Sequence, residues 1–307
     1  MSARHYCARA WADGSYPIGT FNAFHIWLAV QTPYLLALIR YLDGAAEAAL
    51  RNFRPALKVS EEEYAELQYR LTTAPARPTL LGSLAGVAVA VLILPLIPQY
   101  LSLLDWSTGP ASVIAYGLLF LILGVQGALV YHIIHQLRLV SHVYAEHAIV
   151  NLFDLSPLYA FSGLTSQTAV GLLIYDYIWL VAAPEMMSQP LGIGFSIFFA
   201  VVAIVTFVWP LLGIHGRLVQ EKQRLLRESS QRLEAMFAKL YDRVDAGELH
   251  SIDELRVTMA SLESGQSMLT RIPTWPWRSE TLRGLVSALL LPLVVFVLQF
   301  VLQRFFA

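Results

Sequence analysis

The sequence predicts an all-α integral membrane protein with five to six transmembrane helices and a cytoplasmic helical hairpin extending from the fifth span. Of its 307 residues, 56% are hydrophobic and only 14% are charged, whereas a soluble domain carries about 25% charged residues. The mean hydropathy is +0.55. Long uncharged stretches recur along the chain, and within lipid a lone segment satisfies its own backbone hydrogen bonds only as a helix.

Charge and cysteine content exclude several classes of function. The chain has 21 Lys and Arg against 22 Asp and Glu, a net charge of −1, so it lacks the basic field of a nucleic-acid-binding module. Its single cysteine, Cys7, rules out an intramolecular disulfide and a cysteine-based metal site. The first 20 residues lack the apolar core of a cleavable signal peptide. We therefore expect insertion through the mature helices.

Residues 1–78 form the N-terminal segment. Its candidate span, 22–42, is weak because four polar or helix-disturbing residues interrupt it: His25, Gln31, Pro33 and Arg40. It either spans the bilayer, lies in the interface or re-enters. The remainder of the segment predicts a cytoplasmic amphipathic helix that begins after Ser60, with Glu63 as the second member of a capping box.

Residues 79–214 form the predicted transmembrane core. A hydrocarbon layer about 30 Å thick needs roughly 20 apolar residues in a helix. The candidate spans are 79–104, 110–134, 168–185 and 191–214. Connections of about five residues predict two antiparallel hairpins. Gly82, Gly86 and Ala90 recur every four residues, a spacing that lets another helix approach closely, either within the chain or between subunits.

Residues 215–270 form the predicted cytoplasmic hairpin. Apolar residues at helical spacing predict one long helix over 191–246, and a second helix over 252–269 folds back along it. The hairpin either shields its own apolar face or contributes that face to a bundle shared by several subunits.

Residues 271–307 combine an interfacial elbow with a final span over 284–303. Two prolines prevent regular helix in the elbow. Trp275 and Trp277 favour the headgroup layer, and Arg278 and Arg283 favour anionic lipid.

The end of the final span, Gln299-Phe300, resembles the last helix of insect gustatory-receptor-like channels. The resemblance covers about 20 residues, and Pro292-Leu293 stand where those channels carry Thr-Tyr. It therefore transfers no residue role to this chain.

Basic residues predict the orientation of the helices. Segment 43–78 carries five Lys and Arg and segment 215–283 carries eleven, whereas the short connections 105–109 and 186–190 carry none. Because cytoplasmic loops are enriched in Lys and Arg, we expect a multi-pass protein of the cytoplasmic (plasma) membrane with its large loops inside and its C-terminus outside. The side of the N-terminus depends on whether 22–42 spans.

Asp176 is the strongest candidate for a functional side chain. An ionised carboxylate at the bilayer centre costs about 2.5 kcal/mol or more, so it needs a partner, water or a proton. Tyr175 and Tyr177 flank it, and the other polar candidates are Gln126 and Gln299. These residues either mark a permeation or proton path or simply form hydrogen bonds between helices.

A second group of candidates is His132, His135, His142 and Glu146, which share one face of a continuous helix, whereas His147 points away from that face. His142 lies one to two turns beyond His135, so one metal ion cannot reach all four. Interfacial histidines, a metal or haem site and a pH sensor remain open interpretations.

The leading functional interpretation is a homo-oligomeric ion channel or transport-like protein gated through its cytoplasmic helices, with the lipid bilayer, ions or a small solute as partners, without nucleic acid and without a cofactor. The alternative is a non-transporting scaffold or sensor that recruits partners through the hairpin. A third is a metal- or haem-dependent membrane redox protein. The chain lacks Walker A, GxSxG and HExxH motifs, so we lean against enzymatic activity.

Overall fold

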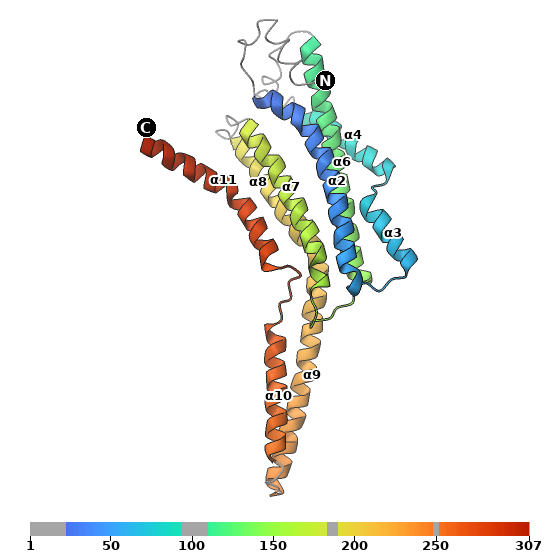
Figure 1. Cartoon of the computed structure of the whole chain (residues 1–307), viewed down its shortest axis with the longest axis vertical. Coiled ribbons are helices and arrows are strands. Elements are labelled where there is room, and N and C mark those ends of the chain that lie inside the picture. Colours follow the sequence, from blue (N-terminus) through green and yellow to red (C-terminus); the bar gives the residue numbers. More distant parts are fainter. Residues whose placement is uncertain (1–22, 94–109, 183–189, 248–251, 307) are drawn as a thin grey trace.

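The computed structural model describes residues 23–93, 110–182, 190–247 and 252–306, and this part of the chain is helical without a strand (Figure 1). The elements are α2 (Ala23–Phe53), η1 (Arg54–Ala56), α3 (Glu61–Thr72), α4 (Ala76–Ile93), α6 (Pro110–Glu146), η3 (Pro157–Tyr159), α7 (Ala160–Ala182), α8 (Pro190–Val208), η5 (Trp209–Leu211), α9 (Leu212–Asp245), α10 (Ile252–Arg271) and α11 (Ser279–Phe306). The predicted all-α class is confirmed.

Among the described residues, three helical stretches are long and apolar enough to cross a membrane: Glu61–Leu92, Tyr116–Glu146 and Gly192–Asp245. These stretches support a membrane protein. The stretches that contain α2, α7 and α11 are not among the three, so the higher span count expected from sequence is taken up as a proposal below.

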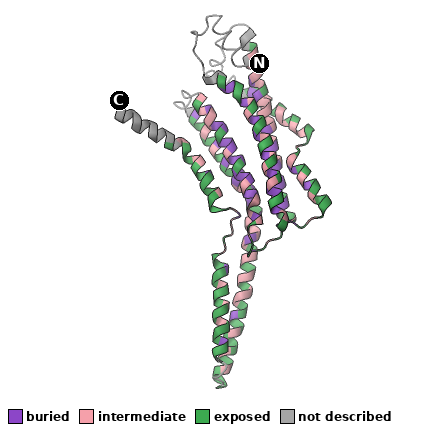
Figure 2. Ribbon diagram, viewed as in Figure 1, coloured by how far each residue is buried: buried purple, intermediate pink, exposed green. Residues whose placement is uncertain are grey.

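The core of the helical bundle lies between α2, α6, α7 and α8. Helix α7 packs against α2 on one side and α8 on the other, and α2 also packs against α6. Figure 2 shows buried residues gathered on these helices, whereas α10 and the described first half of α11 are mostly exposed. At one end of the core, Phe53, Tyr144 and Phe161 pack with ring centroids 5.1–5.4 Å apart. The aromatic cluster anchors α2, α6 and α7 to one another.

Two helices extend further than the hydrophobic stretches predict. Helix α2 continues to Phe53, beyond the predicted span 22–42, because the sequence after Asp43 is rich in alanine and other good helix formers. Helix α6 continues to Glu146, beyond the predicted span 110–134 and in agreement with the continuous helix on which His132 to Glu146 were placed. Each extension contains polar residues, and hydropathy alone would assign these residues to a loop.

Helices α4 and α6 approach closely through glycines. Gly82 and Gly86 face Gly127, and a Cβ added at Gly127 would lie 2.2 Å from the Gly82 carbonyl oxygen. A Cβ at Gly86 would lie 2.3 Å from the Leu123 carbonyl oxygen. Ala90, the third member of the small-residue stripe, is buried. The face expected to accept another helix thus receives α6 of the same chain.

The α9–α10 hairpin extends well beyond the bundle (Figure 1). A 3-10 turn at Trp209–Leu211 joins α8 to α9 at Pro210, since proline removes a helical backbone donor. Gly247 ends the first arm with a φ of 75°, a backbone conformation that favours glycine. Helix α10 lies beside α9, as the fold-back predicts.

The capping box predicted at Ser60 is confirmed. The Ser60 hydroxyl accepts a 3.2 Å hydrogen bond from the Glu63 backbone N–H, and the Glu63 carboxylate accepts one of 2.9 Å from the Ser60 N–H. The start of helix α3 is therefore determined by a capping motif that can be recognised in the sequence.

Candidate functional site

Asp176 lies inside the bundle on α7, and its residue is 2% exposed. The Ser196 hydroxyl on α8 donates a hydrogen bond to Asp176 Oδ1 at 3.3 Å. Among the described residues this is the hydrogen bond that Asp176 accepts, and an ionised carboxylate can accept about four. Asp176 is thus a buried carboxyl group that receives a hydrogen bond from α8.

The two neighbours of Asp176 contact different helices. The Tyr175 hydroxyl donates to Gln126 Oε1 on α6 at 3.1 Å, and the Tyr177 hydroxyl donates to the Ala288 carbonyl oxygen on α11. Consecutive helical residues point about 100° apart. Residues 175–177 thus join α7 to three separate helices, namely α6, α8 and α11.

Polar groups of α2 complete the environment of Tyr175. Gln31 is fully buried beside the Tyr175 hydroxyl. Within the described part of the chain, neither amide atom of Gln31 has a hydrogen bond of ordinary geometry, and the same holds for the Thr32 hydroxyl. Buried polar atoms without a protein partner are sites where ordered water binds. From sequence, Gln31 was expected only to interrupt the candidate span 22–42.

A cavity of about 370 Å³ adjoins this polar cluster. Its wall is mostly apolar side chains of α6 and α8, among them Ile133, Phe199 and Val202. Gln126, Tyr175 and Thr206 contribute its polar atoms. The cavity is thus suited to an apolar group, because its lining is almost entirely apolar. Gln299, the remaining candidate, lies in α11 where the side chains are not described.

The histidines of α6 do not gather into one site. His132 Nε2 lies 3.1 Å from Asp43 Oδ1 on α2, an ion-pair distance without the alignment of a hydrogen bond. His135 Nε2 lies 3.2 Å from the Arg70 carbonyl oxygen and its ring stacks on Tyr131. Asp43 was not among the residues predicted from sequence, although the good helix formers that follow it indicate that the helix continues through this position.

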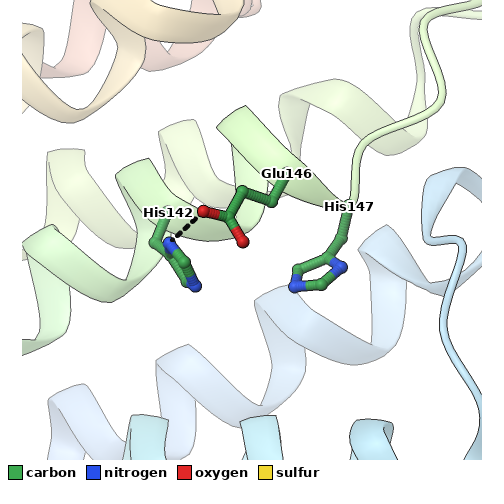
Figure 3. A group of neighbouring side chains, drawn as sticks. All are labelled: His142, Glu146 and His147. Carbon is green, nitrogen blue, oxygen red and sulfur yellow. Dashed lines mark ion pairs between the residues drawn. The ribbon is translucent and has the colours of Figure 1, made fainter.

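His142 and Glu146 instead meet a third residue, His147 (Figure 3). His142 Nδ1 lies 3.2 Å from Glu146 Oε1, and one ligand atom from each of the three residues lies within 4.8 Å of the others. The expectation that His147 points away from this group is wrong, because one of its ring nitrogens lies within 4.8 Å of the ligand atoms of His142 and Glu146.

The elbow before α11 is a stack of aromatic rings. The His215 and Trp275 centroids are 3.8 Å apart, those of Trp275 and Trp277 are 4.4 Å apart, and Trp277 packs on Phe207 at 5.2 Å. Lys222 donates to the carbonyl oxygens of Thr270 and Ile272, both at 2.7 Å. The elbow is therefore tied to α8 and α9 as well as to the two helices it connects.

The cationic residues expected to anchor the elbow, Arg278 and Arg283, are exposed. Burial raises the pKa of Tyr159 above its ordinary value, and the guanidinium of Arg278 partly offsets this rise. Arg278 therefore lies close enough to η3 to act on its tyrosine. Tyr159, at the start of α7, and the elbow are thus electrostatic neighbours.

Comparison of the chain with protein-family models, with curated proteins and with solved structures finds no match.

Proposed function

We propose that the chain is a five- to six-span integral membrane protein that assembles into a homo-oligomeric ion channel or transport-like protein, gated through its α9–α10 hairpin. The carrying observation is the contact of residues 175–177 with α6, α8 and α11. A buried carboxylate with one hydrogen bond to α8, flanked in the sequence by tyrosines that contact α6 and α11, is an arrangement expected where a cation or proton crosses apolar surroundings. Its position makes Asp176 sensitive to relative movement of those helices.

The elbow supports the proposed route of gating. The hairpin is joined to α11 through the stack of His215, Trp275 and Trp277, and α11 contacts α7 at Tyr177, next to Asp176. Movement of the hairpin would therefore be transmitted to the carboxylate through a continuous series of packed groups. Two discrete arrangements of this series would constitute an open and a closed state.

The proposed topology places the hairpin and the other large loops in the cytoplasm and the C-terminus outside. The basic residues of 43–78 and 215–283 support this orientation. Exposed apolar residues along α11, among them Val286, Leu290 and Val294, support contact with lipid or with a second subunit. The proposed oligomer would place α11 near its centre. Tyr177, which contacts α11 at Ala288, and the adjacent Asp176 would then lie close to that centre.

Ion flux through purified full-length protein in liposomes tests the proposal. The variant Asp176→Asn keeps the side-chain volume and removes the charge. Asp154→Asn is the control because Asp154 is exposed in a loop and its Oδ1 accepts only a local hydrogen bond from Ser156. Size-exclusion profiles and helical circular dichroism of both variants should match the unmodified chain.

We expect cation or proton flux that falls at least about tenfold in Asp176→Asn and is retained in Asp154→Asn. Equal flux in all three proteins would remove Asp176 from the path. Absence of flux for common cations, anions and protons from correctly inserted protein would contradict a constitutive pore.

A scaffold or sensor is the second candidate, and the exposed tip of the hairpin favours it. Phe237, Tyr241, Val244 and Val257 are 41–65% exposed there, and exposed apolar side chains grouped at one end of a helix pair are typical of protein docking. Liposome flux separates the candidates. A protein that shows no ion flux but binds a cytoplasmic partner through its hairpin tip would support the scaffold function. Loss of that binding in Phe237→Ser/Tyr241→Ser would identify the hairpin tip as the binding surface.

A further inference from the structure

The side chains of His142, Glu146 and His147 converge at the end of α6 that leads into the loop before η3 (Figure 3). A ligand atom from each lies within 4.8 Å of the others. His142 and Glu146 are exposed, with side chains 45% and 58% accessible. The cluster lies outside the Asp176 site, and the proposed ion path makes no use of it.

Helix geometry and a non-local bridge position the three groups. His142 and Glu146 are one helical turn apart, at a spacing that places their side chains on the same face. The backbone of His147 is held on both sides, since its N–H donates to the Val143 carbonyl at 3.0 Å and its C=O accepts from the Lys58 N–H at 3.0 Å. The imidazole of His147 is thus directed by a fixed backbone.

A neighbouring contact extends this support. The Ile149 N–H donates to the Ala56 carbonyl at 2.7 Å, and Leu57 and Ala148 form an antiparallel bridge. On the other side of the helix end, Arg217 of α9 donates to the Tyr144 and Ala145 carbonyls at 2.6 and 3.2 Å. The end of α6 is therefore anchored to two distant segments, and this limits how far its ligands can separate.

Two imidazoles and one carboxylate have the chemistry of a transition-metal site. Zn²⁺ forms bonds of about 2.0–2.2 Å with histidine nitrogen and carboxylate oxygen, which places neighbouring ligand atoms roughly 3.3 Å apart in a tetrahedron. His142 Nδ1 and Glu146 Oε1 already have this separation, at 3.2 Å. Mg²⁺ and Ca²⁺ favour sites made of oxygen atoms, so they are poor candidates here.

We propose that His142, Glu146 and His147 bind a divalent transition-metal ion, with Zn²⁺ as the representative, and that solvent or an external ligand completes its coordination. The ion would cross-link the last turn of α6 to the segment that pairs with Ala56 and Lys58. This site is independent of ion conduction, so its test and the flux test can succeed or fail separately.

Metal binding by the full-length protein in detergent tests the proposal. The affinity tag must contain no histidine, and the protein is first treated with chelator and then titrated with Zn²⁺ against a chromophoric competitor. Co²⁺ is the second probe, because its visible absorption reports tetrahedral coordination by protein ligands. The variants are His142→Ala, Glu146→Gln, His147→Ala and, as a control, His135→Ala on the same helix.

We expect one Zn²⁺ per chain with a dissociation constant in the micromolar range or below, weakened at least about tenfold in each ligand variant and unchanged in His135→Ala. Co²⁺ should give a tetrahedral spectrum that His142→Ala/His147→Ala abolishes, and Mg²⁺ should not compete. Binding weaker than millimolar, or equal binding in the unmodified chain and the double variant, would overturn the proposal. Because the ligands lie at the surface, the variants should retain the unmodified helical content.

Discussion

His132 on α6 and Asp43 on α2 approach to 3.1 Å between Nε2 and Oδ1, and both side chains are nearly inaccessible to solvent. The contact joins the N-terminal helix to the centre of α6. One turn along α6, Gln136 donates to the Leu71 carbonyl at 3.0 Å. Polar contacts therefore hold α2 and α3 to the bundle, a feature that the sequence analysis of 22–42 as a weak candidate span does not predict.

Removing both members of the Asp43–His132 pair should destabilise the protein by less than the sum of the two single removals. Asp43→Ala leaves a buried imidazole without its partner, and we expect the free energy of unfolding to fall by about 2–4 kcal/mol. His132→Ala/Asp43→Ala should cost less than the sum of the single changes. The free energies of unfolding for this double-mutant cycle are measured in mixed micelles by tryptophan fluorescence. Additive costs would contradict a direct interaction.

Gly127→Ala should separate α4 from α6. The new Cβ would lie 2.2 Å from the Gly82 carbonyl oxygen, and backbone cannot rotate away as a side chain can. We expect a loss of roughly 1–3 kcal/mol in unfolding free energy. Gly124→Ala is the matched control one turn earlier, since its Cβ would meet only Val87 at 3.6 Å. Similar thermal unfolding of the two variants, measured by circular dichroism, would argue against tight glycine packing.

Local signals account for the parts of the fold that were predictable. Proline at residue 210 coincides with the turn between α8 and α9, and the Ser60 capping box starts α3. The ends of α2 and α6 were not predictable from hydropathy. Their last turns carry charged residues, and helix propensity together with tertiary contacts such as Asp43–His132 extends them.

The candidate site was predictable in type but not in its partners. A lone carboxylate in an apolar stretch identified Asp176, whereas its partner Ser196 depends on the rotation of α8, which sequence periodicity leaves open. His147 illustrates the same limit. Its meeting with His142 requires knowing that α6 ends at Glu146 and that the next residues pair with Ala56 and Lys58, segments far apart in the chain.

The aromatic elbow should hold the start of α11 against α9. His215→Ala removes both the stack on Trp275 at 3.8 Å and the contact of Nδ1 with the Thr274 carbonyl at 3.0 Å. A stacked pair contributes about 1 kcal/mol, so amide exchange over 272–285 should accelerate about fivefold. Trp275→Phe keeps an aromatic ring and should change exchange little. Equal acceleration in both variants would mean that stacking does not hold the elbow.

Arg224 bridges two carboxylates on α9, Glu221 at 2.5 Å and Glu228 at 2.7 Å. Its hydrogen bond to Glu221 lowers the pKa of that carboxyl below the ordinary value of 4.5. Because the folded pKa is lowered, the contribution to stability is present above the unfolded value and is lost as the pH falls through the folded one. The groups are exposed, so salt should screen the effect.

The test of this bridge is amide exchange in α9, corrected for intrinsic rates, between about pH 6 and about pH 3. Protection of residues 217–230 should fall as Glu221 is protonated, by less than about fivefold for a surface ion pair. Glu221→Gln should reduce protection at the higher pH and flatten the pH dependence. Glu234→Gln, an exposed carboxyl on the same helix, should leave both unchanged. A pH dependence of protection that persists in Glu221→Gln would mean that another group causes it. High salt should diminish the difference in protection between the unmodified chain and Glu221→Gln, because the interaction is electrostatic and solvent-exposed.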